Sequence, residues 1–165
     1  MSNNDFHYRI IKARVAETLV KELFQNCGYT VFEYGMERTV PTILGRIQNK
    51  DEETAKQIRS MPDFVVQNSK NGKLDYVEVK YRKDGRFLLS DLIKEYPYKN
   101  AVFIIVSKHN IKAITYSELK EGKTIQADGV NLEEFPVFDL SKELVWKYRR
   151  YAESFFDGVE WPVNP

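Results

Sequence analysis

Several features that would assign a protein to a specific class are missing from this 165-residue sequence. It has one cysteine, Cys27, so no disulfide can form within the chain, and a reducing cytoplasmic location is expected. No apolar run approaches the roughly 20 residues that a membrane span needs. The first residues contain no apolar signal-peptide core. The sequence therefore predicts a protein without a membrane partner.

Short catalytic patterns of other enzyme classes are also missing. The sequence contains neither a G-x-S-x-G pattern nor a Walker-type phosphate loop, which argues against an esterase or an ATPase. His7 and His109 lie far apart without ligand-spaced companions, so a zinc site is not expected. The net charge of +1 neither indicates nor excludes nucleic-acid binding, because such binding needs only a local basic surface.

The sequence does contain a clear order of predicted elements. Apolar residues recur every three to four positions over 5–28, which predicts an amphipathic helix that ends at Gly28. A strand is predicted over 29–35, followed by a short helix within 49–60 that begins near Asn49 or Asp51 and by a hairpin over 61–83 with its turn at Asn71-Gly72. A helix over 88–97, with Ser90 as a candidate cap, precedes two strands over 101–107 and 111–117. Irregular structure is expected over 118–140, and a final helix over 141–156 has Ser141 as its cap.

These elements predict an α/β fold in which a small mixed β-sheet is flanked by helices. The length suits one domain over residues 1–165. We expect a core over about 8–116, an insertion over about 35–60 and a C-terminal helical extension over about 118–165.

Charged residues stand where the predicted hairpin should be buried. Because side chains alternate along a strand, Val77, Val79 and Tyr81 should face the core, and Tyr76, Glu78, Lys80 and Arg82 should share the opposite face. If the hairpin pairs as expected, Asp63 lies beside Glu78. Two converging carboxylates repel each other, and either protonation or a bound cation would relieve the repulsion. Carboxylate oxygens with spare water positions suit Mg²⁺, and a neighbouring lysine could orient a water or stabilise a phosphate.

This arrangement resembles the core motif of the PD-(D/E)XK nuclease superfamily, which has the restriction-endonuclease-like fold. Pro62-Asp63 matches the PD and Glu78-Val79-Lys80 matches the ExK. Some members, Holliday-junction resolvases among them, carry a glutamate on the preceding helix, and Glu17 matches that position. The resemblance covers roughly residues 8 to 106. Two further ExK patterns, which begin at Glu118 and Glu121, lack a strand pattern and a PD partner.

The resemblance implies a Mg²⁺-dependent deoxyribonuclease, with Mn²⁺ able to substitute, and favours an endonuclease over an exonuclease. Asp63, Glu78 and the Val79 backbone carbonyl would be metal ligands, and Glu17 would assist directly or through water. Lys80 would position or activate the attacking water. In-line attack would leave 5′-phosphate and 3′-hydroxyl ends. Arg82, Lys83 and Arg86 follow the motif and are candidates for contacts with DNA phosphates.

Other interpretations of the same residues remain open. Glu17 could pair with Arg14 or Lys21 on its own helix, Glu78 could pair with Lys80 on an exposed surface, and Asp63 could be a turn or cap residue. The alternative function is a catalytically inactive module of the same fold that binds DNA or a protein. A small interaction protein of an unrelated α/β fold is a third hypothesis.

The sequence does not select a substrate or an oligomeric state. Duplex, branched and single-stranded DNA stay open, and so does RNA. Cutting two strands often uses two copies of a nuclease, so a homodimer is compatible with the expected nuclease function. Phe155, Phe156 and Trp161 could form its contact or could close the core.

Overall fold

The computed structural model, which describes residues 3–35, 47, 52–126 and 129–157, begins with the long helix α1 (Asn3–Asn26). The second half of α1 buries Ala16, Leu19, Val20, Leu23 and Phe24, at the spacing of one helical face. Gly28 follows with a φ of +83°, a conformation that glycine adopts without strain. The first predicted helix and its end at Gly28 are therefore confirmed.

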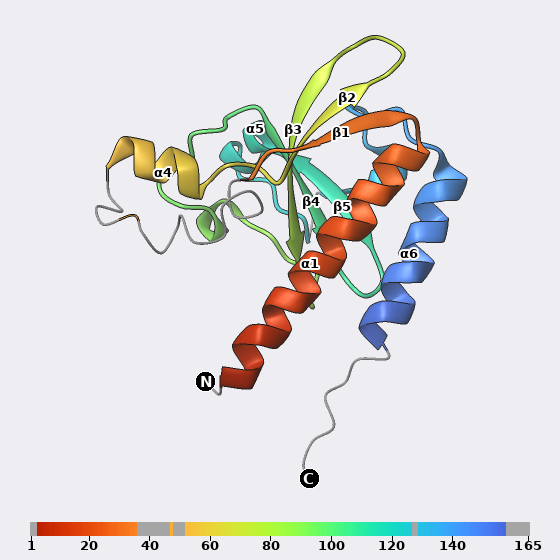
Figure 1. Ribbon diagram of the computed structural model, residues 1–165, viewed down its shortest axis with the longest axis horizontal. Helices are drawn as coiled ribbons and strands as arrows, with labels where there is room; N and C mark the ends of the chain where they lie inside the picture. The colour runs from red at the N-terminus through yellow and green to blue at the C-terminus, as the bar shows by residue number, and fades with distance from the viewer. Residues whose placement is uncertain (1–2, 36–46, 48–51, 127–128, 158–165) are drawn as a thin grey trace.

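One six-stranded sheet forms the centre of the fold (Figure 1). Its strands lie in chain order: β1 (Tyr29–Glu33), β2 (Phe64–Asn68), β3 (Leu74–Tyr81), β4 (Ala101–Val106), β5 (Ile111–Thr115) and β6 (Val130–Asn131). The β3–β4 pair is parallel, and the other neighbouring pairs are antiparallel. The expected mixed sheet is thus confirmed.

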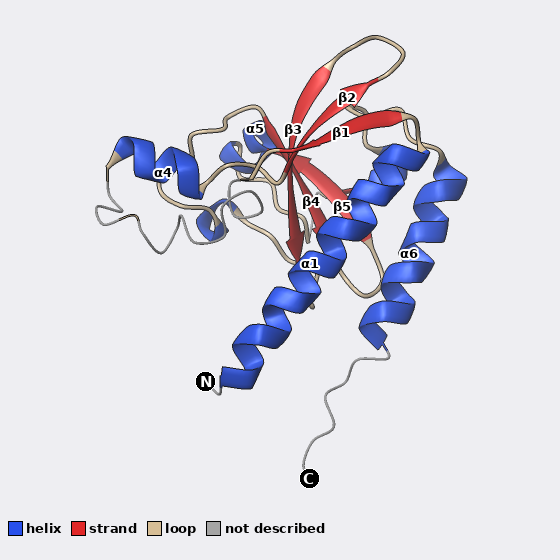
Figure 2. Ribbon diagram, viewed as in Figure 1, coloured by secondary structure: helices blue, strands red, loops and turns tan. Residues whose placement is uncertain are grey.

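Helices and connecting segments cover both faces of this sheet (Figure 2). Helix α1 and the C-terminal helix α6 (Lys142–Asp157) pack beside each other and supply one hydrophobic cluster. The segment after β3 and the short helix α5 (Tyr116–Lys120) supply a second cluster. Strand β4 contributes alternate residues to both clusters, which explains why its sequence is apolar throughout.

Strands β2 and β3 form the predicted hairpin. The Gly72 N–H donates to the carbonyl of Asn68 at 2.8 Å, and the Asn68 N–H donates to the carbonyl of Lys73 at 2.9 Å. Gly72 has a φ of +72°, as its place in a reversal requires. Phe64 pairs with Val77, and this register fixes which side chains of the two strands meet.

The predicted helix over 88–97 is wrong. Only a 3₁₀ turn, η1 (Leu89–Asp91), forms there, and Ser90 lies inside it instead of capping a helix. The Asp91 carboxylate accepts from the Leu88 N–H at 2.8 Å, and Leu92 is already extended. The turns and bends that follow, with Glu95 at a φ of +58°, lead the chain to a position where Phe87 and Tyr96 both pack against Phe103 of β4. Packing on the sheet has overridden the local helical pattern.

The insertion contains the predicted short helix, α4 (Glu53–Arg59). The start expected at Asn49 or Asp51 lies outside the described residues. The region expected to be irregular contains part of α5, strand β6 and a second 3₁₀ turn, η2 (Leu132–Glu134). No helix in the described part of the chain is long and apolar enough to span a membrane.

The C-terminal extension completes the hydrophobic core. The rings of Phe24 in α1 and Phe138 lie 4.9 Å apart. The Asn26 side-chain amide donates to the hydroxyl of Tyr148 in α6 at 2.8 Å. The Ser141 hydroxyl accepts from the Leu144 N–H at 3.3 Å, which confirms the predicted cap of this helix.

Candidate active site

The hairpin brings two of the predicted carboxylates together. Asp63 precedes β2 by one residue and Glu78 lies in the middle of β3. Because Phe64 pairs with Val77, the antiparallel register sets Asp63 beside Glu78. Lys80 follows two residues later and shares the face of Glu78.

Asp63 is held by hydrogen bonds at both its side chain and its backbone. Its carboxylate Oδ2 accepts from the Val79 N–H at 2.8 Å. Its carbonyl oxygen accepts from the N–H groups of Tyr34 and Gly35 at 3.0 and 3.4 Å. These hydrogen bonds fix the position of the Asp63 carboxylate between the two strands, which differs from the turn or cap role considered as an alternative.

Glu78 is buried and only partly satisfied. Its Oε1 accepts a hydrogen bond from the Lys80 ammonium, which also forms an ion pair with it. Its Oε2 is buried and has no hydrogen-bond partner among the described residues. The Glu78 side chain is 12% exposed and that of Lys80 is 36% exposed, so the ion pair is part-buried with its carboxylate on the buried side. A buried carboxylate oxygen without a donor is unfavourable unless another group binds it.

Burial and neighbouring charges shift the pKa values of these three groups. Burial first, and then the charges of Glu78 and Glu17, raise the pKa of Asp63 well above its usual value. Burial also raises the pKa of Glu78, although Lys80 opposes the shift. Burial alone would lower the pKa of Lys80, but the charges of Glu78 and Asp63 outweigh it and raise that pKa. Lys80 is therefore an ammonium ion at neutral pH.

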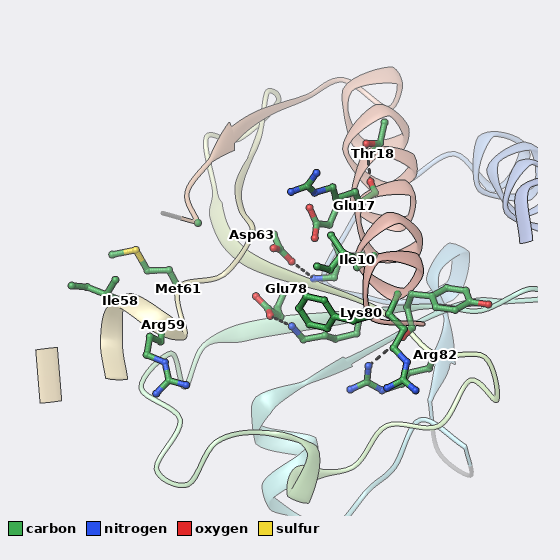
Figure 3. Close-up of a pocket in the computed structure, with 17 residues that line it drawn as sticks. Ile10, Glu17, Thr18, Ile58, Arg59, Met61, Asp63, Glu78, Lys80 and Arg82 are labelled. Atoms are coloured by element: carbon green, nitrogen blue, oxygen red, sulfur yellow. Dashed lines mark hydrogen bonds and ion pairs between the residues drawn. The ribbon is translucent and has the colours of Figure 1, made fainter. Parts of the chain in front are cut away.

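All three groups open into a cleft of about 960 Å³ (Figure 3). Helix α1 forms one wall, and the end of α4 with Met61 stands across from it. Glu17 reaches the cleft from α1. Val79, whose N–H binds the Asp63 carboxylate, is also part of the lining. Lys21, one of the two alternative partners of Glu17 beside Arg14, forms an ion pair with Glu33 at 2.7 Å.

The donor set suits a hard divalent cation that keeps part of its water shell. In the described part of the chain, no three His, Cys, Asp or Glu side chains cluster as a ready metal site. Mg²⁺ is commonly bound through one or two carboxylates and waters, so Asp63 and Glu78 are enough. The partnerless Oε2 of Glu78 is the observation that favours such a ligand. Glu17 and the Val79 carbonyl are the further candidate ligands.

The cationic residues of the cleft differ in part from the expected set. Arg82 lines the cleft, whereas Lys83 and Arg86 are exposed outside its lining. The cationic side chains in the lining are Arg9, Arg14, Arg59, Lys80 and Arg82.

Sequence reasoning missed three of these arginines. Arg14 lies three residues before Glu17, so it shares a helical face with a candidate site residue, and this spacing could have identified it. Arg59 has no such signal, because its position depends on how α4 packs.

The two other ExK patterns, which begin at Glu118 and Glu121, lie at the short helix α5 and not at the cleft. Glu118 forms a reciprocal capping box with Thr115 at the start of α5 and pairs with Lys123 at 3.5 Å. Neither pattern contributes to the cleft lining.

Comparison of the sequence with models of protein families and with curated proteins finds no match in either set.

Proposed function

We propose that this chain is a metal-dependent nuclease that hydrolyses DNA phosphodiester bonds, with a PD-(D/E)XK site on a restriction-endonuclease-like core. The observation that carries the proposal is the buried Oε2 of Glu78, which has no hydrogen-bond partner among the described residues, next to the fixed carboxylate of Asp63. A structural ion pair with Lys80 would not require a second buried carboxylate beside it.

Each residue of the site has a role that follows from its charge and position. Asp63 and Glu78, with Glu17 and the Val79 carbonyl nearby, would hold Mg²⁺ or Mn²⁺. The cation would supply a Lewis acid and would ease deprotonation of water. Lys80 would position or activate the attacking water, or stabilise charge on the phosphate. Water adds to phosphorus, the bond to the 3′ oxygen breaks, and a proton passes to that oxygen.

The test is a cleavage assay with Mg²⁺ or Mn²⁺ on supercoiled plasmid, single strands and a four-way junction, with EDTA as the metal-free control. Lys80→Ala should abolish cutting, while circular dichroism shows an unchanged fold. Lys120→Ala is the matched control, because Lys120 belongs to another ExK pattern and is exposed on α5. It should cut like wild type.

Retained cutting by Lys80→Ala would remove this residue from the mechanism. DNA binding without metal-dependent cutting on any substrate would instead support the catalytically inactive module of the same fold. Isothermal titration of Mg²⁺ into wild type and Glu78→Gln would then show whether the two carboxylates still bind a cation.

A further inference from the structure

The first half of α1 projects beyond the hydrophobic core. From Phe6 to Val15 no residue is fully buried, and among the side chains described Ala16 is the first buried one, with Val15 packed against the core beside it. These ten positions span about 15 Å of helix at 1.5 Å per residue. Figure 1 shows this end of α1 extending away from the sheet. We call residues 6–15 the α1 arm.

One side of the α1 arm lines the cleft and the other does not. Phe6, Arg9, Ile10 and Arg14 face the cleft at helical spacing. Ile11 lines a separate small groove beside Phe155, and Lys12 lies over the rings of Tyr8 and Tyr81. Across from the arm, Ile58, Arg59 and Met61 form the opposite wall (Figure 3).

The cleft is both cationic and apolar. Its lining has five cationic side chains against the three carboxylates of the site, in a chain whose net charge is only +1. This local excess favours a polyanion. The same walls present apolar side chains, and Phe6 is 61% exposed. Exposed phosphates alone would not need these apolar groups.

We propose that the α1 arm and the end of α4 bind an unpaired polynucleotide strand. Arg9, Arg14 and Arg59 contact its phosphates, and Phe6 and Ile58 contact its bases. A duplex hides the faces of its bases within the stack, whereas an unpaired strand offers them to aromatic side chains. The inference deepens the proposed nuclease function by naming the form of substrate that enters the cleft.

The binding test is run without divalent metal, in EDTA, so that it does not depend on cutting. Fluorescence anisotropy compares a labelled 20-nucleotide single strand with its blunt duplex over a range of salt. Wild type should bind the single strand more tightly. Arg9→Ala should flatten the salt dependence by about 0.7 in log–log slope, the value for one lost single-strand phosphate contact. Lys120→Ala, on α5 and outside the cleft lining, should leave the slope unchanged.

A second pair of variants, one in the cleft and one outside it, tests the contact with bases. Phe6→Ala should weaken single-strand binding by roughly tenfold, as loss of one stacking side chain does, with little change for the duplex. Ile11→Ala removes an equally exposed apolar side chain outside the cleft and should have no effect. Circular dichroism checks that each variant keeps its helices.

The two proposals fail in different ways. Equal effects of Phe6→Ala and Ile11→Ala, or tighter binding of the duplex, would overturn the strand-binding inference even if the protein cuts DNA. Preferred single-strand binding that depends on Phe6 and Arg9 would support it even if no metal-dependent cutting is found, in which case the nuclease proposal alone is lost.

Discussion

The Asp63 carboxylate accepts a hydrogen bond of 2.8 Å from the backbone N–H of Val79, 16 residues further along the chain. This bond joins the start of β2 to the middle of β3, at the point where Glu78 and Lys80 enter the cleft. Asp63 is therefore part of the hairpin structure and of the candidate site at the same time. Substitutions there should separate the two roles.

Asp63→Asn should stabilise the metal-free protein at neutral pH. The amide oxygen can still accept from Val79, but the substitution removes an acid whose ionised form is disfavoured by burial and by the charges of Glu78 and Glu17. The folded-state pKa of Asp63 lies above the unfolded value of about 3.9. The folded protein therefore binds more protons than the unfolded chain between these two values, and stability falls as pH rises through that window.

Thermal unfolding of both proteins in EDTA, from about pH 4 to pH 8, measures this effect. The melting temperature of Asp63→Asn should exceed that of wild type by a few degrees near neutral pH, and the two should converge toward pH 4. Parallel pH profiles would show that Asp63 does not carry the linkage. The variant should also lose metal-dependent cutting if the proposed function holds.

Phe156→Ala should destabilise the fold by about 3–5 kcal/mol, the range for removing a buried phenylalanine. The Phe156 ring lies 4.3 Å from that of Tyr81 on β3 and is 7% exposed. Phe155 is 52% exposed, so Phe155→Ala should change stability by no more than about 0.5 kcal/mol. Urea unfolding gives both values, and similar losses in the two variants would refute the assignment of Phe156 to the core.

Ser141→Ala should lower stability by about 1 kcal/mol, because the Leu144 N–H loses its cap at the start of α6. Ser154→Ala serves as the control, since Ser154 is exposed within the same helix. Chemical unfolding monitored by circular dichroism should show the loss in the first variant only. A cap without energetic value would leave both midpoints equal.

Tyr96→Phe should raise stability by about 1 kcal/mol, because it removes a polar group that is buried without compensation. The Tyr96 hydroxyl has no hydrogen-bond partner among the described residues, and burial with the nearby charges of Glu78 and Asp63 raises its pKa. Tyr148→Phe should act in the opposite direction, since the Asn26 amide donates to that hydroxyl. Melting temperatures measure both effects, and a lower melting temperature for Tyr96→Phe would contradict the prediction.

Strand register made the centre of the site predictable from sequence. Alternation along residues 74–82 and the Asn71-Gly72 turn are local features, and together they set Asp63 next to Glu78. The separate helix α1 had to be matched by resemblance, and Glu17 does line the cleft. The cap at Ser141 was likewise readable, because capping depends on residues only three apart.

Features that depend on packing between distant segments were not predictable in this way. The helical pattern over 88–97 gave way to a 3₁₀ turn and further turns, along which Phe87 and Tyr96 both reach Phe103. Arg59 enters the cleft through the placement of α4, which no local pattern encodes. The α1 arm was hidden for a similar reason, since apolar spacing continues through Ile11 and Val15 although the core begins only at Ala16.

The pairing of α1 with α6 has a consequence for how the protein folds during synthesis. Asn26 and Tyr148, which join the two helices, are 122 residues apart. Helix α1 leaves the ribosome before α6, and its apolar face is not fully covered until α6 has also emerged. The strands between them can pair before that moment, because each strand neighbours the next in the chain. A nascent chain would therefore hold a formed hairpin while α1 still exposes apolar surface, a state in which chaperones commonly bind.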